Sequence, residues 1–409
     1  MFLKLKDVWS IHYFDDYSYL IFNTGCFMIL DPVQTYVIKS FIISNYEYEK
    51  AICFIKEDLD IDIEQVKNTL NIVLCDLNHI LIKQDTNVNK PVITSGKSGL
   101  YYPESIQISL TNTCKHKCKH CYKISKYSGG HLDYSILENF LNYLYPYCSN
   151  ISLTGGEPFE YKDIIKLLEN FGEKFDFSIT TSGYFESNIP YEYYNKFSLV
   201  QVTLYGTNPH QHDEFVGVEG SFSKVKAFID TLLNNNINTI VTYQRKTNDI
   251  SEVDELIKLC ISLGVKKVMI GEIIPVGRSE KNKLFMENND RESQMNELKN
   301  RYLDKIKIIF DESENIVPEN NYFFKCYAGF KQWHIVEDGR IVPCSLVDYD
   351  LFEMGNIFDK DSYISLINNG VYEKIQGRWL NDKIKIYNAY KNRGINISNI
   401  CNKIESSLI

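Results

Sequence analysis

The sequence predicts an α/β protein built on a parallel sheet, which is either an open doubly wound sheet or a whole or partial barrel. Six short apolar runs alternate with amphipathic segments from residue 105 onward, and this alternation is typical of parallel sheets. A polar stretch with two prolines precedes the first run, and the alternation stops near residue 315. We therefore expect an α+β domain at 1–85, a linker at 86–104, the parallel-sheet domain at 105–315 and a small unit at 316–409.

The first 85 residues carry both strand and helix signals. "HYFDDYSYLIFNTGCFMILD" contains two β-rich runs joined at "NTG", which predicts a hairpin. In "DIEQVKNTLNIVLCDLNHILI" the apolar residues recur every three or four positions, which predicts an amphipathic helix. This segment has one lysine against three acids, so it does not resemble a helix that reads DNA.

The parallel-sheet domain should place its chemistry at one edge, because functional residues in such folds gather at the carboxyl ends of the strands. Three cysteines in "TNTCKHKCKHCYK" follow the first expected strand, and "TGGEPFE" follows the second. Both motifs therefore fall on the same rim. The six expected strands are 105–111, 150–154, 176–182, 199–205, 238–243 and 266–273.

The three cysteines, Cys114, Cys118 and Cys121, have the spacing C-x-x-x-C-x-x-C. A structural zinc site could add His116 or His120 as a fourth ligand, although zinc sites more often contain C-x-x-C pairs. An iron–sulfur site fits the spacing better, because three thiolates can hold a [4Fe–4S] cubane at three irons and leave the fourth iron open. A non-catalytic zinc-binding interaction protein is the alternative.

The cysteine segment "CKHKCKHCY", together with "GGEP" after the second strand, resembles the radical S-adenosylmethionine (SAM) superfamily. The superfamily signature is C-x-x-x-C-x-aromatic-C, and His120 stands in the aromatic position. The resemblance implies a partial (β/α)6 radical SAM barrel, with a [4Fe–4S] cluster at the three cysteines and SAM on its open iron. It also places Gly155, Gly156 and Glu157 beside the SAM amino group.

The resemblance extends to the later strands. Thr203, in "VTLYGTNPHQHDEFVGVEGSF", matches the position that meets the SAM ribose, and Ser182, in "TTSG", matches the end of the third strand. Pro275 and Gly277, in "EIIPVGR", resemble the end of the sixth strand near the adenine. Many relatives have an arginine near the position of Val216 for the SAM carboxylate, so the partner of that carboxylate is unassigned here, as are the catalytic residues.

The tail carries a second signature of this kind. Cys326, Gly339 and Cys344, the last two in "EDGRIVPCS", resemble the auxiliary-cluster domains called SPASM and twitch. The chain has only Cys401 after these, which matches the shorter twitch type with one auxiliary iron–sulfur cluster. Three cysteine ligands would leave one iron for water, for a side chain such as His334, or for a substrate thiolate.

The N-terminal unit resembles the winged-helix domain with which peptide maturases bind the leader of a ribosomally made precursor. The whole chain therefore resembles a radical SAM peptide maturase, in which a 5′-deoxyadenosyl radical takes a hydrogen from the precursor. The expected product is a thioether between a cysteine sulfur and an α-carbon, as in sactipeptides. Carbon–carbon crosslinking stays open, and so does epimerisation. Cys148 or Cys260 could donate the hydrogen atom that epimerisation needs, but a core position fits each of them better, and Cys260 lies on the apolar stripe of "DELIKLCISLG". Sulfatase maturation fits poorly, because sulfatase-maturing enzymes lack the N-terminal recognition domain.

Composition and charge restrict the cellular compartment and the classes of binding partner that we expect. The formal charge of −9 argues against a general nucleic-acid binder, and no run approaches the roughly 20 apolar residues of a membrane span. The start "MFLKLKDVWS" lacks a signal peptide, and 11 cysteines in uneven spacing do not form a disulfide framework. We expect a cytoplasmic enzyme whose partners are a precursor peptide, bound through its leader, and a one-electron donor such as flavodoxin or ferredoxin.

Overall fold

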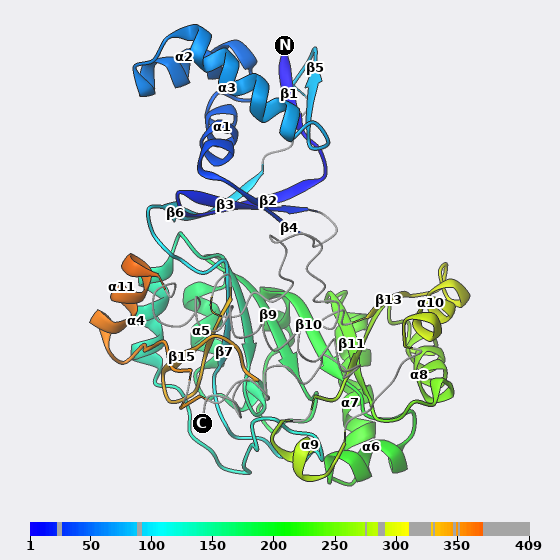
Figure 1. Ribbon diagram of the computed structural model, residues 1–409. Coiled ribbons are helices and arrows are strands. Elements are labelled where there is room, and N and C mark those ends of the chain that lie inside the picture. Colours follow the sequence, from blue (N-terminus) through cyan, green and yellow to red (C-terminus); the bar gives the residue numbers. More distant parts are fainter. Residues whose placement is uncertain are drawn as a thin grey trace, which may run out of the picture.

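The computed structural model describes residues 1–22, 27–87, 92–274, 276–284, 291–310, 329, 332–346, 349–350 and 352–370. A small N-terminal domain lies against one end of a larger α/β domain (Figure 1). Within the described residues, no helix is long and apolar enough to cross a membrane.

The N-terminal domain combines two small sheets with three helices. One sheet pairs β1 with β5 in antiparallel fashion, and the other has the order β4-β3-β2-β6. The strands β3 and β4 form the antiparallel pair that the sequence predicts, although the "NTG" turn between them lies outside the described residues. The elements are β1 (Phe2–Leu5), β2 (Val8–Asp15), β3 (Tyr17–Phe22), β4 (Phe27–Leu30), α1 (Pro32–Ile43), α2 (Tyr48–Leu59), α3 (Ile63–Asp76), β5 (Leu81–Gln84) and β6 (Ile93–Ser98).

Two of these helices begin at capping boxes. Asp31 caps α1 and Asp62 caps α3, and in each case the side-chain oxygen of a glutamine three residues later accepts a hydrogen bond from the cap backbone N–H. The predicted apolar stripe of α3 is buried at Val66, Leu70 and Val73. The helix prediction from the three-four spacing is therefore confirmed for residues 63–76, whereas Leu81 and Ile82 at the end of the predicted segment belong to β5.

The segment predicted as a linker, 86–104, is a strand over part of its length. Strand β6 pairs in parallel with β2. Gly96 has φ +74°, and a Cβ there would lie 2.0 Å from the carbonyl oxygen of Tyr13. Its N–H donates to the carbonyl of Tyr147 in the larger domain, at 2.6 Å. Small polar residues around a glycine conceal this strand in the sequence, because they carry little β propensity.

The larger domain is built on a ten-stranded sheet with the order β13-β12-β11-β10-β9-β8-β7-β14-β15-β16. Neighbours from β7 to β13 are parallel and follow chain order, as expected for a partial barrel. All six predicted strands are present, and β13 is an additional one. They are β7 (Ser105–Ser109), β8 (Asn150–Thr154), β9 (Asp176–Thr181), β10 (Phe197–Thr203), β11 (Thr239–Arg245), β12 (Lys267–Glu272) and β13 (Lys307–Phe310).

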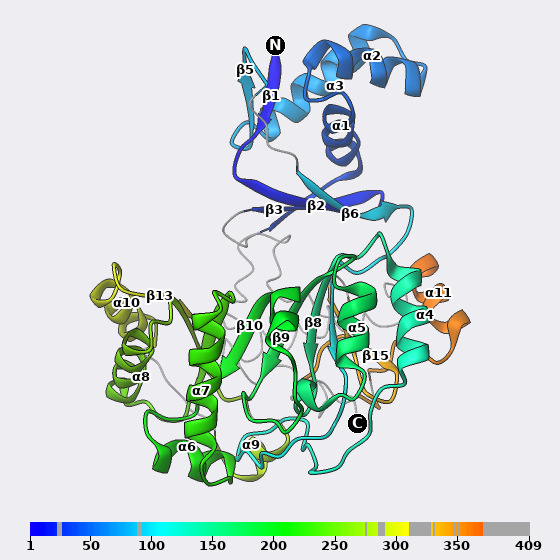
Figure 2. The same ribbon diagram turned by 180° about the vertical axis from the view of Figure 1, so that it is seen from behind.

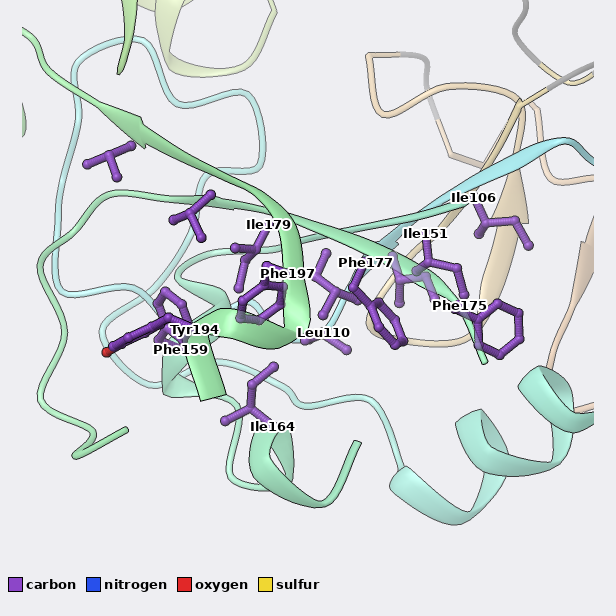
Figure 3. Packing of buried hydrophobic residues seen from close by; sticks show 14 of the residues in the cluster. Ile106, Leu110, Ile151, Phe159, Ile164, Phe175, Phe177, Ile179, Tyr194 and Phe197 are labelled. Atoms are coloured by element: carbon purple, nitrogen blue, oxygen red, sulfur yellow. The ribbon is translucent and has the colours of Figure 1, made fainter. Parts of the chain in front are cut away.

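Helices cover the outer face of this sheet, as the view from behind shows (Figure 2). Those on this face include α4 (Tyr134–Leu144), α5 (Ile164–Phe171), α7 (Ser221–Asn234) and α8 (Ile250–Ser262). The domain also contains α6 (Pro209–Val216), α9 (Arg278–Lys281) and α10 (Arg291–Arg301). Apolar side chains from the strands and from the helix side form a continuous core that includes Ile106, Ile151, Phe177 and Ile164 (Figure 3). This packing holds the carboxyl ends of the strands in fixed positions.

The described part of the tail continues the same sheet. Strand β14 lies parallel to β7, on the side away from β8, because Trp333 and Ile335 are apolar residues that become fully buried there. Antiparallel β15 and β16 follow, and Tyr363 of α11 packs on Phe140 of α4. The tail elements are β14 (Gln332–Ile335), β15 (Arg340–Val342), β16 (Gly355–Asn356) and α11 (Lys360–Asn369).

Candidate metal and cofactor site

The three cysteines lie in a loop that leaves the carboxyl end of β7, and we call residues 111–126 the cysteine loop. Backbone pairing closes its base, since Cys114 N–H donates to the carbonyl of Lys126 at 2.7 Å. Cys114 is buried, and Cys118 and Cys121 are partly exposed. In the described residues, no three His, Cys, Asp or Glu side chains converge on a single-ion site. Thiolates around a cubane are instead distributed over three irons.

The environment of Cys114 and Cys118 opposes ionisation of their thiols in the metal-free protein. Burial raises the pKa of Cys114 to about 12 and that of Cys118 well above its usual value, and the Arg278 guanidinium lowers both pKa values by a smaller amount. Metal binding at these sulfurs must therefore release protons.

The "GGE" segment after β8 lies directly against the cysteine loop. Gly156 N–H donates to Thr111 O at 2.6 Å, and Glu157 N–H donates to Thr113 O at 2.7 Å. A Cβ on Gly155 would lie 2.4 Å from Thr111 O, and one on Gly156 would lie 2.2 Å from Thr113 O. Only glycine permits this approach of two backbones.

Glu157, which follows β8, connects the "GGE" segment to the carboxyl end of β9. Its side chain is fully buried, and its carboxylate accepts hydrogen bonds from Thr181 Oγ1 (2.7 Å), Ser182 N (2.8 Å), Ser182 Oγ (2.5 Å) and Phe159 N (3.2 Å). Burial raises the pKa of Glu157 to about 7, against the smaller opposite effect of these hydrogen bonds. The structure thus brings the predicted residue Ser182 into contact with Glu157.

Thr203 ends β10 at the same rim and shares a hydrogen bond of 3.1 Å with Thr242 of β11. None of the contacts described here joins Thr203 to the "GGE" segment. It is linked to the strand before this segment through the sheet order β8-β9-β10.

His120 occupies the aromatic position of the signature and behaves as an aromatic packing residue. Its ring lies 4.9 Å from the ring of Tyr205 and 5.3 Å from that of Phe215. Burial lowers its pKa to about 4. Val216 is fully buried in the apolar cluster of Tyr205 and Phe215, and its carbonyl accepts from Lys117 N–H at 2.8 Å. It therefore packs beneath the cysteine loop.

A buried histidine chain supports the cysteine loop, and sequence reasoning missed it. Tyr205 N–H donates to His212 Nδ1 (3.2 Å), so His212 carries its proton on Nε2 and donates to Ser221 Oγ (3.1 Å). The Ser221 hydroxyl then donates to His116 Nε2 (2.8 Å). These tautomers follow from the hydrogen-bond network. No local motif signals the chain, because 105 residues separate His116 from Ser221.

Gly277, which the resemblance places near the adenine, contacts the cysteine loop. A Cβ there would lie 2.7 Å from Cys121 O and 2.6 Å from Tyr122 O. Pro275 lies outside the described residues.

The tail places one of its three predicted cysteines near this site. Cys344 is partly exposed, and its sulfur accepts a hydrogen bond from Leu346 N–H at 3.4 Å. Tyr122 of the cysteine loop interacts with Ser345 and lies near Cys344. Cys326 and Cys401 lie outside the described residues.

The structure corrects the expectation for His334 and confirms that Cys148 and Cys260 are core residues. His334 is not free to bind iron, because its two ring nitrogens already have partners in Ser109 (3.2 Å) and Gln107 (3.0 Å). Cys148 and Cys260 are fully buried in the core, where burial raises the pKa of each to about 12. Neither thiol is placed to donate a hydrogen atom to a peptide at the rim.

Comparison with known proteins identifies the barrel. Residues 108–260 match the model of the radical SAM superfamily. This part of the chain is a radical SAM domain. It carries the cysteine loop and the "GGE" segment on neighbouring strands.

Two relatives are similar to the chain over a longer stretch than the radical SAM domain. The chain is 26% identical over 296 residues to the antilisterial bacteriocin subtilosin biosynthesis protein AlbA of Bacillus subtilis, covering 69% of this chain and 64% of AlbA. It is 24% identical over 274 residues to the sporulation killing factor maturation protein SkfB of the same organism, covering 64% of this chain and 65% of SkfB. The chain thus spans just under two thirds of these relatives.

A solved structure resembles almost the whole fold. Streptococcus suis SuiB bound to its precursor peptide SuiA superposes with a TM-score of 0.63 at 16% identity, covering 91% of this chain and 90% of SuiB. At this identity the likeness establishes the fold of the covered part of the chain, which is longer than the radical SAM domain.

Proposed function

We propose that this protein is a radical SAM enzyme that modifies a ribosomally made precursor peptide, forming a thioether between a cysteine sulfur and an α-carbon. The observation that carries the proposal is the direct backbone contact between the cysteine loop and the "GGE" segment within a radical SAM domain. The names of AlbA and SkfB, which concern a bacteriocin and a killing factor, support a peptide substrate.

The residues at the rim fit a cluster and SAM. Cys114, Cys118 and Cys121 would hold a [4Fe–4S] cluster, and the close backbone at Gly155 and Gly156 would leave room for the methionine part of SAM beside it. When bound, the cluster and SAM supply a 5′-deoxyadenosyl radical after reduction by a donor such as flavodoxin or ferredoxin. Glu157 uses its acceptor positions within the protein, so its part is to fix Ser182 and the rim.

Thioether formation needs an electron acceptor. After the radical has taken a hydrogen atom from the α-carbon, that carbon bonds to the cysteine sulfur, the thiol proton leaves, and one electron is surplus. An auxiliary iron–sulfur cluster held by Cys326, Cys344 and Cys401 would accept this electron. The contact of Tyr122 with Ser345 supports a site for it below the cysteine loop.

The deciding experiment is anaerobic reconstitution of the Cys114→Ala/Cys118→Ala/Cys121→Ala variant. We expect it to form no 5′-deoxyadenosine from SAM, and reductive SAM cleavage by this variant would contradict the proposal. Cys53→Ser/Cys75→Ser, which removes two exposed cysteines of the N-terminal domain, is the matched control. The triple variant lacks the ligands of the first cluster, so the iron that it still binds measures the auxiliary cluster. We expect about four irons per chain, and adding Cys344→Ala to the triple variant should remove them.

The leader would bind the N-terminal domain by strand addition. Strand β4 is the outer strand of its sheet among the described residues, whereas β6 faces the larger domain. An extended peptide can therefore pair with β4. Hydrogen exchange of the full chain with a synthetic peptide, copied from a small reading frame beside this gene, should slow at 27–30 and stay unchanged at 93–98. Equal exchange at 27–30 with and without this peptide would rule out β4 as the binding edge.

A further inference from the structure

The turn after β12 lies against the cysteine loop, and we call residues 276–282 the β12 turn. Arg278 N–H donates to Cys121 O at 3.1 Å, and Asn282 Nδ2 donates to Lys119 O at 2.7 Å. Gly277, at φ +65°, lets the two backbones approach. The β12 turn therefore satisfies carbonyls that no helix or strand pairs in the cysteine loop.

The guanidinium of Arg278 adds two bonds to this contact. Its Nη1 donates to Cys118 O at 3.1 Å, and its Nη2 donates to Ser125 O at 2.7 Å. These carbonyls lie on either side of Cys121, so one rigid fork spans the part of the loop that carries the third cysteine. A lysine could not reproduce this planar, two-point contact.

The base of the fork is itself fixed. Ser279 is fully buried, its hydroxyl accepts from Val276 N–H at 2.9 Å, and it donates to the carbonyl of Ile274. The backbone of Arg278 is therefore held at the end of β12 by contacts that do not involve the cysteine loop.

Among the described residues, Arg278 differs from three lysines of the cysteine loop in its ion pairing. Three lysines of the cysteine loop each form an ion pair, namely Lys115 with Glu186, Lys119 with Glu214 and Lys123 with Glu337. Among the described residues, no carboxylate lies within ion-pair distance of Arg278. Its positive charge faces the cysteines, and the described part of the chain gives it no anionic partner.

We propose that Arg278 is a positioning residue for the cluster at Cys114, Cys118 and Cys121: its fork holds the cysteine loop in shape, and its charge offsets the negative charge of the iron–sulfur cluster. This inference rests on the cluster of the proposed function. A cluster with three thiolate ligands is anionic and gains a further negative charge on reduction, so a nearby cation stabilises the reduced form.

Two substitutions separate the two contributions of Arg278. Arg278→Gln removes the charge and the fork, and Arg278→Lys keeps the charge and loses the fork. Lys119→Gln is the matched control, because it removes a loop charge that Glu214 already neutralises. All proteins carry Cys344→Ala, so that the signal comes from the first cluster, and circular dichroism of the metal-free proteins checks folding.

After anaerobic reconstitution, iron loss to a chelator and the midpoint potential of the reduced-cluster electron paramagnetic resonance signal are measured. We expect faster iron loss in both Arg278 variants, a more negative potential in Arg278→Gln, and a potential close to that of the parent protein in Arg278→Lys and Lys119→Gln. Parent-like retention and potential in Arg278→Gln would overturn the inference. If the parent itself takes up no cluster, the proposed function fails instead.

Discussion

Replacing Glu157 with glutamine should change stability in opposite directions at low and high pH. The carboxylate accepts from two hydroxyls and from two backbone N–H groups, of Phe159 and Ser182. A glutamine amide has only one oxygen, so one of these N–H groups loses its acceptor while the hydroxyls can turn. A buried donor without a partner costs about 1–3 kcal/mol.

Ionisation of the buried Glu157 carboxyl group destabilises the parent protein at high pH, and this effect offsets the cost of the lost hydrogen bond in the glutamine variant. Burial raises its pKa from 4.5 to about 7, so between these values the native protein keeps a proton that the unfolded chain has released. The carboxyl group contributes stability that is present below pH 4.5 and is lost as the pH rises through about 7. The pKa difference corresponds to about 3 kcal/mol. Glutamine does not titrate and avoids this loss.

Glu157→Gln should therefore be less stable than the parent by about 1–3 kcal/mol at pH 5, and equally stable or more stable at pH 8. Urea unfolding of both metal-free proteins at pH 5, 6, 7 and 8 measures the difference, in which the other titrating groups cancel. Glu160→Gln removes a carboxylate that accepts from Glu186 N–H at 2.8 Å, nearer the surface, and should show no crossover. A difference for Glu157→Gln that stays constant from pH 5 to pH 8 would refute the reasoning.

Three further predictions follow from single positions. Gly156→Ala should lower the iron content after reconstitution, because its Cβ would lie 2.2 Å from Thr113 O, whereas the matched change Gly130→Ala, whose Cβ would meet its nearest atom at 4.0 Å, should not. Burial lowers the pKa of His334 to about 3, so its contribution is lost as the pH falls below 6.5. His334→Gln should therefore reduce the slope of unfolding free energy against pH by up to about 1.4 kcal/mol per pH unit, as measured by urea unfolding at pH 5 and pH 7. Trp333→Ala should cost about 3–5 kcal/mol in the same assay, and a cost below about 1 kcal/mol would contradict its burial.

The sequence predicts the barrel well because its signals are local. The strands β7, β8, β10 and β11 are apolar runs that are each followed by an amphipathic helix, and parallel strands place their carboxyl ends together. The meeting of the cysteine loop with the "GGE" segment follows from these two facts alone. The assignment of cluster and SAM ligands stays a prediction.

The elements that sequence reasoning missed depend on distant partners. Strand β6 has few residues of high β propensity and pairs with β2 far back in the chain. The side chain of Arg278 binds a carbonyl 160 residues away, and His334 meets Gln107 across 227 residues. No window of local sequence contains either pair, so the supporting contacts of the site are visible only in the folded chain.

The position of β14 beside β7 has a consequence for synthesis of the protein. Strand β7 carries the cysteine loop, yet one of its two neighbours is made 227 residues later. At a translation rate of about 5–20 residues per second, this strand waits on the order of ten to fifty seconds with an open edge. Open strand edges pair with other chains. Chains cut short before residue 332 should therefore aggregate, and the nascent barrel needs protection until its tail emerges from the ribosome.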